Sequence, residues 1–167
     1  ETDLFDRATN FSQNINSWNV SNVTDMSFMF SYATAFNNDI SNWDVSNVTN
    51  MKGLFYNSIN FNQDISSWDV SNVINMEFMF QNANSFSADI SSWNVSSLTN
   101  AWYMFTQAIN FNSDISSWDV SNVTDLSFMF YAAESFNQDI SIWDVSNVID
   151  FNSIFIGASS LSDEVKC

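Results

Sequence analysis

A repeat of fixed length is the feature that most constrains this chain. Phenylalanine recurs every 25 residues from Phe5 to Phe155, and tryptophan does so from Trp18 to Trp143, without an insertion or deletion. Self-similarity with a period of about 20–50 residues is typical of solenoids, in which each repeat forms one coil stacked on the next. The sequence therefore predicts a single solenoid domain over residues 1–167, made of about six and a half repeats.

One repeat, residues 36–51, predicts the course of a coil. Ile40, Trp43 and Val45 have the spacing of a leucine-rich-repeat strand, and apolar and polar residues alternate there as on a strand with one buried face. In the following stretch, residues 48–55, the apolar residues fall three and four apart, which favours a short helical or 3₁₀ turn. We expect one short parallel β-strand and one such turn per repeat, with the tryptophans inside.

The loops are rich in asparagine and poor in the usual turn formers. The chain has no proline, and Gly53 and Gly157 are its only glycines, so asparagine is expected to form the turns. One row is predicted to hydrogen-bond from coil to coil; it comprises Asn37, Asn62, Asn112 and Asn137, with serine at positions 12, 87 and 162.

Composition and charge exclude several function classes. Apolar residues make up 46% of the chain and aromatic residues 17%, which is enough for a continuous core. The net charge of −16 would repel nucleic acids and anionic bilayers, and no apolar run approaches the roughly 18 residues of a membrane span. The chain has no histidine, the commonest general base and transition-metal ligand. We expect no nucleic-acid partner, no membrane insertion and no catalysis.

The repeat pattern F-N-x-D-I-S-x-W-D-V-S-N-V-T-x-M-x-x-M-F, clearest from Phe36 onward, covers essentially the whole chain. It resembles the 25-residue surface-protein repeat of BspA-type leucine-rich-repeat proteins. The resemblance implies a right-handed, leucine-rich-repeat-like solenoid displayed extracellularly on cell surfaces, often in long arrays. It also implies roles in adhesion and partner binding, and the family has no catalytic motif to transfer.

One acidic row is predicted to face outward from the strands, on the concave face of the sheet. As the outward positions of a solenoid often bind partners, we expect this row to be the contact strip for a protein or glycan. The other interpretation is a charged surface that prevents aggregation. The row consists of Asp44, Asp69, Asn94, Asp119 and Asp144, with Asn19 in register.

A second acidic row has two interpretations that stay open. Carboxylates repeated in every coil would repel one another unless something compensates. Each carboxylate either accepts backbone N–H bonds in a turn or helps to hold a line of Ca²⁺ ions between coils. No other cofactor or metal is expected. The row consists of Asp39, Asp64, Asp89, Asp114 and Asp139, preceded by Asn14 and ending in Glu164.

Aromatic side chains at a variable position form a candidate assembly stripe, used for packing against a neighbour. Partial burial under the loops is the other interpretation. The stripe consists of Phe28, Phe78, Trp102, Tyr103 and Phe128, with Tyr32, Tyr56 and Tyr131 nearby. Asn-x-Ser/Thr sequons add candidate glycosylation sites at Asn22, Asn47 and Asn122.

The two ends bear on function as well. Residues 1–5 enter in mid-turn and residues 161–167 stop in mid-strand, so we expect part of a longer array or head-to-tail contact with another copy, with Cys167 at the joint. The predicted function is therefore a non-enzymatic extracellular module for recognition or adhesion. The alternative is a structural subunit of an extracellular filament or coat. A weaker alternative is ice binding through a broken threonine row, Thr24, Thr49, Thr99 and Thr124.

Overall fold

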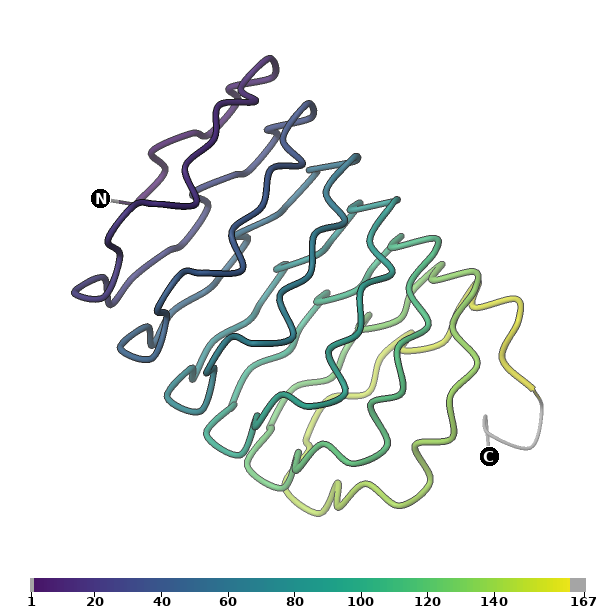
Figure 1. The fold of residues 1–167 in the computed structure, drawn as a ribbon. Helices are drawn as coiled ribbons and strands as arrows, with labels where there is room; N and C mark the ends of the chain where they lie inside the picture. The colour runs from purple at the N-terminus through teal and green to yellow at the C-terminus, as the bar shows by residue number, and fades with distance from the viewer. Residues whose placement is uncertain (1, 163–167) are drawn as a thin grey trace.

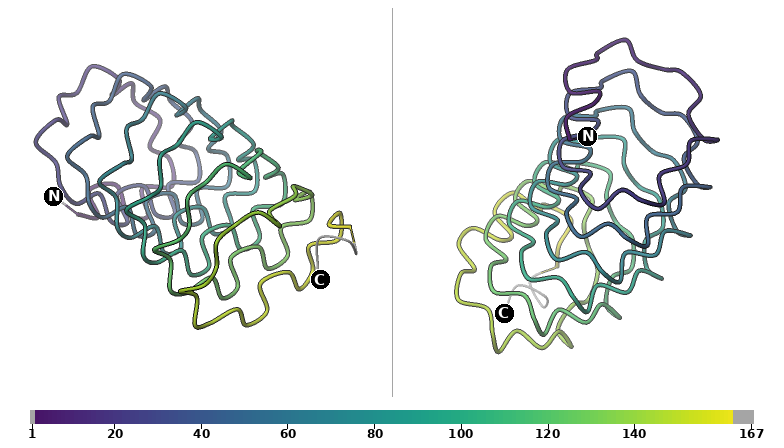
Figure 2. Two further views of the ribbon diagram at one scale, coloured as in Figure 1. Left: turned by 90° about the horizontal axis from the view of Figure 1, so that it is seen from below. Right: turned by 90° about the vertical axis from the view of Figure 1, so that its left-hand side faces the viewer.

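The computed structural model describes residues 2–162, which form one solenoid. Figure 1 shows the coils following one another from the N-terminal to the C-terminal end. In Figure 2, which includes a view from the N-terminal side, the coils lie behind one another with similar outlines. The predicted stack of coils is thus confirmed. No helix in this part of the chain is long and apolar enough to cross a bilayer.

The secondary structure differs from the prediction. Residues 2–162 contain neither a helix nor a continuous strand, so the strand expected at Trp43 and the helical turn expected at 48–55 are absent from these residues. The coils consist of successive tight turns joined by short extended segments. Isolated parallel bridges run along the stack through Asp25, Asn50, Asn75, Asn100, Asp125 and Asp150.

The backbone ladder between coils lies just after these bridges, in the stretch predicted to be helical. In one coil, the N–H groups of residues 51, 53, 55 and 57 donate to the carbonyls of residues 75, 77, 79 and 81 at 2.8–2.9 Å. The intervening N–H groups of Leu54 and Tyr56 instead close turns onto Met51 and Gly53. Consecutive turns place apolar residues three and four apart, as a helix does, and this similarity explains the wrong prediction.

This ladder requires left-handed backbone at two places in each coil. At the first place, φ is 53–60° at Phe28, Gly53, Phe78, Tyr103 and Phe128. The second place is at Tyr32, Asn57, Asn82, Gln107 and Ala132. A left-handed backbone costs a residue with a Cβ atom about 1–2 kcal/mol, so glycine would be the easiest choice throughout. Gly53 has a further reason to be glycine, because a Cβ atom there would overlap the ring of Phe28.

Each coil also contains three turns headed by an aspartate or asparagine side chain. In one coil, Asp39 Oδ1 accepts the N–H of Ser41 at 2.9 Å, and Asp44 Oδ1 accepts the N–H of Ser46 at 3.1 Å. The third turn is headed by Asn50, described with the site below. Such side chains bond the backbone two residues on, and this explains how the chain turns without proline and with two glycines.

The predicted inner tryptophan row is confirmed. Trp93 is 4% exposed, and its indole N–H donates to the carbonyl of Ile65 in the preceding coil at 3.0 Å. The same bond, at 3.0–3.2 Å, is made by Trp43, Trp68, Trp118 and Trp143. Trp18, in the first coil, is 44% exposed.

Two stacks of phenylalanine rings run beside the tryptophans. Within a coil, the rings of Phe55 and Phe61 stack with centroids 3.8 Å apart, and the ring of Phe80 in the next coil stacks on Phe55 at 5.6 Å. All three rings are fully buried. The core is therefore continuous along the axis, so each coil depends on its neighbours for burial.

The predicted asparagine row bonds from coil to coil as expected. Asn37 Oδ1 accepts the N–H of Asn62, and Asn62 Oδ1 accepts the N–H of Ser87, both at 2.8 Å. A second row, at the start of each Asn-Val pair, was not predicted to do so. There the side-chain N–H groups of Asn47 and Asn72 donate to serine carbonyls of the preceding coil at 2.8 Å.

We predict that Trp93→Phe lowers the free energy of unfolding by about 1–3 kcal/mol, because it removes a buried inter-coil hydrogen bond and part of a packed ring. Urea denaturation followed by circular dichroism measures this loss. The matched control is Trp18→Phe, which should change stability by less than about 0.5 kcal/mol because Trp18 is exposed. Equal losses in the two variants would contradict the role assigned to the buried indole.

Candidate functional site

The repeat varies strongly just after its third turn. Core and turn positions carry nearly the same residue in every coil, whereas the pair after this turn does not. That pair is Ser27-Phe28, Lys52-Gly53, Glu77-Phe78, Trp102-Tyr103 and Ser127-Phe128 in successive coils. We call the exposed side of the ladder over residues 27–34, 52–59, 77–84, 102–109 and 127–134 the variable face.

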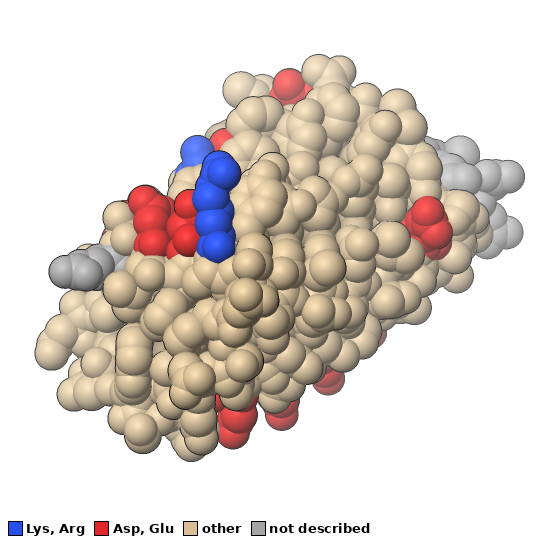
Figure 3. Space-filling view, turned by 90° about the horizontal axis from the view of Figure 1, so that it is seen from above, with Lys and Arg blue, Asp and Glu red and all other residues tan. Residues whose placement is uncertain are grey.

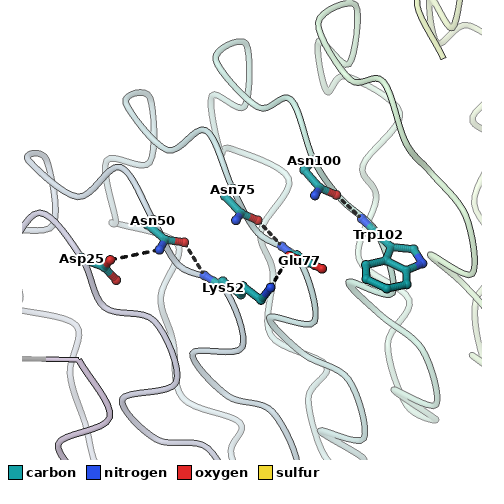
Figure 4. A network of polar contacts seen from close by, with 7 residues as sticks. All are labelled: Asp25, Asn50, Lys52, Asn75, Glu77, Asn100 and Trp102. Carbon is teal, nitrogen blue, oxygen red and sulfur yellow. Dashed lines mark hydrogen bonds and ion pairs between the residues drawn. The ribbon is translucent and has the colours of Figure 1, made fainter. Parts of the chain in front are cut away.

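Asparagine or aspartate side chains hold the start of each segment of this face, and Figure 4 shows three of the asparagines. In each coil the side-chain oxygen of the bridge residue accepts the N–H two residues on, at 2.8–3.1 Å. The next residue then takes the left-handed conformation. These oriented pairs are Asn50 with Lys52, Asn75 with Glu77, and Asn100 with Trp102.

An ion pair between neighbouring coils neutralises the charge on this face. Lys52 Nζ lies 2.7 Å from Glu77 Oε2, and the Glu77 side chain is 9% exposed. The ammonium group of Lys52 also lies over the ring of Phe78, 5.5 Å from its centroid. The two opposite charges thus cancel locally, and Lys52 covers one side of an aromatic ring.

Aromatic rings on the face touch one another in sequence. The ring of Trp102 contacts Phe78 at 5.0 Å and Tyr103 at 4.8 Å, and Tyr103 stacks on Phe128 at 4.6 Å. All of these side chains are partly exposed. We call the connected set the aromatic ribbon; it consists of Tyr32, Tyr56, Phe78, Trp102, Tyr103, Phe128 and Tyr131.

The structure thus brings together most of the predicted stripe. Phe78, Trp102, Tyr103 and Phe128 lie in the ribbon, whereas Phe28 packs over Gly53. The ribbon also includes tyrosines three or four residues further along each coil, which the sequence analysis placed nearby without assigning them to the stripe. Of these tyrosines, Tyr32 has left-handed backbone, whereas Tyr56 and Tyr131 lie one residue before the left-handed Asn57 and Ala132.

The variable face carries little charge. Its segments contain only Lys52, Glu77 and Glu134 as charged residues, although the chain has a net charge of −16. Figure 3 shows one side of the molecule: lysine and arginine atoms lie beside acidic atoms near one end, other acidic atoms lie at the margins, and the broad area between them is uncharged. Most of the negative charge of the chain therefore comes from residues outside these segments.

An open groove adjoins the ladder at the second left-handed position. Its volume is about 380 Å³, and its lining combines amide and aliphatic side chains from successive coils. Asn82 Nδ2 donates to Asn57 Oδ1 at 2.9 Å, whereas the exposed Gln107 amide makes no side-chain hydrogen bond within residues 2–162. The sequence analysis did not identify this groove, because its residues look like ordinary loop asparagines. It is lined by Asn57, Ile59, Asn82, Asn84, Gln107, Ile109, Ala132 and Glu134.

The predicted contact strip is exposed but does not lie on a strand, so its placement on a concave sheet face was wrong. Hydrogen bonds from the Ser46 hydroxyl and N–H lower the pKa of Asp44. Asp69 is held in the same way by Ser71. Asn94 replaces aspartate in this row and makes the same bond, to Ser96 at 3.1 Å. The same turn geometry holds at Asp119 and Asp144.

The second acidic row also serves turns. Hydrogen bonds from the N–H and hydroxyl of Ser41 lower the pKa of Asp39, and the pKa of Asp64 is lowered although Asp89 repels it. The backbone-bonding interpretation therefore describes these carboxylates. Within residues 2–162, no group of three or more His, Cys, Asp or Glu side chains is arranged to hold a metal ion, and Ca²⁺ binding stays an untested prediction.

Some side chains of the candidate glycosylation sites and of the threonine row make hydrogen bonds between coils. Asn47 and Asn122 donate their side-chain N–H groups to the preceding coil at 2.8 Å, so the nitrogen atoms that glycosylation would modify are already bonded. Asn22 is exposed at the start of this row. In the threonine row, the hydroxyls of Thr49 and Thr99 likewise bond carbonyls of the preceding coil, at 3.2 and 3.0 Å.

Comparison with known proteins points to one repeat family. The family described as "Mycoplasma protein of unknown function, DUF285" matches residues 2–86 and 60–166. No curated protein matches the chain at a significant level.

Two solved structures are similar in outline. A leucine-rich-repeat protein from T. pallidum is 10% identical with a TM-score of 0.46, over 86% of this chain and 74% of that one. A leucine-rich-repeat protein from Eubacterium ventriosum ATCC 27560 is 16% identical with a TM-score of 0.44, over 83% of this chain and 41% of that one.

We predict that acid destabilises the fold partly through the outward acidic row. The pKa values of these aspartates are lowered in the folded state, so the unfolded chain binds more protons as the pH falls below about 4 and stability decreases there. A variant with asparagine at positions 44, 69, 119 and 144 should lose less stability between neutral and acid pH. Thermal melts across this range measure the difference.

The matched control for that experiment has alanine at the same four positions. It should be less stable at neutral pH as well, because alanine cannot accept the turn hydrogen bond whereas asparagine can, as Asn94 does. Identical acid profiles for the wild-type chain and the asparagine variant would show that these carboxylates do not set the acid sensitivity.

Proposed function

The chain belongs to the DUF285 family of proteins of unknown function, and from this premise we propose that it is a non-enzymatic recognition module that binds its partner through the variable face. Extracellular display and a role in adhesion, which the resemblance to BspA-type proteins implies, are part of the proposal. The partner would be a protein or a glycan on another surface.

The observation that carries the proposal is the presence of bulky aromatic residues where the backbone favours glycine. Phe78, Tyr103 and Phe128 have φ values of 56–59°, in a row where Gly53 shows that no side chain is required. Strained backbone of this kind persists where the surroundings or a function demand the side chain. The aromatics also lie partly exposed in one connected ribbon, as recognition surfaces often do.

The acidic rows are weaker candidates for the binding surface than the variable face, because their residues already have a structural role. Their carboxylates already accept turn hydrogen bonds, and Asn19 and Asn94 make the same bonds without a charge. The shape of the backbone therefore accounts for these residues without a ligand. The outward acidic row remains a candidate contact surface, but nothing in its geometry requires a partner.

We predict that changes on the variable face, and not in the acidic row, abolish binding. The purified chain is applied to arrays of immobilised proteins and glycans, and the wild-type chain should bind at least one of them. The double variant Trp102→Ala/Tyr103→Ala should lose that binding, whereas the matched variant Asp69→Asn/Asp119→Asn should keep it. Loss of binding only in the aspartate variant, or no binding by the wild-type chain, would refute the proposal.

A second candidate, head-to-tail assembly, is favoured by the apolar surface of the last described coil. Val145 is 37% exposed, Phe151 44% and Ile156 57%, whereas Val120, at the position of Val145 one coil earlier, is 2% exposed. A further coil, from the same chain or from a second copy, would cover this surface. Contacts of this type continue along an axis and produce filaments.

We predict that, if copies assemble in this way, sedimentation velocity shows species that grow with protein concentration. Val145→Asp/Phe151→Asp should abolish them because buried carboxylates at the joint would be unpaired. Ile149→Asp, a change at an 87% exposed side position, is the control and should leave them intact. A monomer at all concentrations would eliminate this candidate.

A further inference from the structure

The two basic side chains within residues 2–162 both lie over rings of the aromatic ribbon. The guanidinium of Arg7 lies 5.3 Å from the centroid of the Tyr32 ring, and Lys52 Nζ lies 5.5 Å from that of Phe78. Contacts of this kind are attractive because the face of an aromatic ring carries partial negative charge. Cation–ring contact is therefore already part of this surface.

Each of these two cations also has a carboxylate beside it. Arg7 Nε lies 3.5 Å from Asp6 Oδ2, and Lys52 Nζ lies 2.7 Å from Glu77 Oε2. In both cases one cation is shared by a ring and a carboxylate. The first coils thus show, within the molecule itself, how a basic side chain is held on this surface.

The later coils have rings of the same kind but no basic residue. Trp102, Tyr103, Phe128 and Tyr131 belong to the ribbon and are partly exposed. Residues 53–162 contain eleven acidic residues and no lysine or arginine. The rings that lack a cation of their own therefore lie in a part of the chain whose charged side chains are all negative.

The charge of these coils favours a basic partner. Hydrogen bonds from Ser121 lower the pKa of Asp119, and the other aspartates of the acidic rows are held in the same way, so both rows are ionised at neutral pH. A field of one sign raises the association rate of a partner of the opposite sign. Phosphate, sulfate or carboxylate groups would be repelled by it.

The backbone of the face leaves recognition to side chains. Extended peptides often add as a strand to an exposed edge with free N–H and C=O groups. On this face the N–H groups of residues 51, 53, 55 and 57 already donate to the next coil. A partner that reaches the rings with long side chains fits this surface better than one that pairs with its backbone.

We propose that the variable face binds an arginine-rich segment of a partner protein, and that the partner's cations contact the rings of the later coils as Arg7 contacts Tyr32. This inference rests on the proposed function and names the chemistry of the partner. Arginine suits the site better than lysine because its guanidinium is planar, weakly hydrated and stacks on rings. Such contacts are made ring by ring, so the rings need not share a plane.

The experiment is a titration of a fluorescein-labelled peptide of alternating arginine and glycine with the full chain, followed by fluorescence anisotropy. The comparison peptide has citrulline, which is neutral and nearly the same shape, in place of arginine. The wild-type chain should bind the arginine peptide at least about tenfold more tightly than the citrulline peptide. Equal affinity for the two peptides, or no binding of the arginine peptide, would overturn the inference.

A pair of variants distinguishes ring contacts from general attraction between opposite charges. Trp102→Ala/Tyr103→Ala should weaken binding of the arginine peptide about tenfold, the loss expected for two cation–ring contacts. Asp69→Asn/Asp119→Asn removes two negative charges and keeps the rings, and should weaken binding less than about twofold at physiological salt. A larger loss in the aspartate variant than in the ring variant would mean that charge alone holds the peptide, and the inference would be wrong.

Further variants separate binding from folding. Trp102→Phe/Tyr103→Phe keeps both rings and should keep most of the affinity, and melting temperatures show whether Trp102→Ala/Tyr103→Ala is folded. If it is not, Tyr131→Ala provides the test, because Tyr131 is partly exposed and its backbone is not left-handed. This change should weaken binding about threefold, and unchanged affinity would contradict the inference.

Failure of this inference is distinguishable from failure of the proposed function. If the arginine peptide does not bind while an immobilised protein without a basic segment, or a glycan, binds through Trp102 and Tyr103, the basic partner is wrong and the recognition face stands. If the arginine peptide binds equally well to the wild-type chain and to both the Trp102→Ala/Tyr103→Ala and Tyr131→Ala variants, the rings do not hold the cations and the inference is overturned.

Discussion

Every level of this structure depends on the hydrogen bonds between coils. Within residues 2–162 the chain has neither a helix nor a continuous strand, so no coil has regular structure of its own. Alternate N–H groups of the ladder, such as those of Met51 and Phe55, donate to the next coil, and the indole of Trp93 donates to the preceding one. Because each coil satisfies its neighbours' polar groups and covers their rings, stability belongs to pairs of coils and not to single repeats.

When similar coils stack, like charges come to lie near one another, and hydrogen bonds in the turns offset their repulsion. Asp64 experiences repulsion from Asp89, which acts to raise its pKa, yet hydrogen bonds from Ser66 outweigh it and the pKa is lowered. The same aspartates that create the negative charge thus shape the backbone. For this reason an acidic row in a repeat protein is weak support for a metal or ligand site. Asn94 makes the same turn bond without a charge, which indicates that the row serves the turn.

The sequence predicted the parts of the fold that depend on burial and missed the part that depends on backbone geometry. The period predicted the stacked coils, and the spacing of Trp43 and its counterparts predicted the inner tryptophan row. The Asp-x-Ser turns were anticipated for the row of Asp39. The ladder at 50–57 was missed because consecutive turns and a helix give the same apolar spacing. Left-handed backbone at Phe78 or Tyr103 leaves no sign in a sequence, since bulky aromatics normally avoid it.

The position of the variable face follows from how the ladder is built. At the bridge and ladder positions the coils are joined by backbone atoms, so the pairs such as Lys52-Gly53 and Trp102-Tyr103 can differ without breaking the joint. On the other sides the coils are joined by side chains, as at Asn62 and Trp93, and there the residue type is fixed by the bond that it makes. The ladder therefore supports a surface whose chemistry can change from coil to coil while the solenoid stays the same. The aromatic ribbon and the amide groove lie on the one side of the molecule where such change leaves the stack intact.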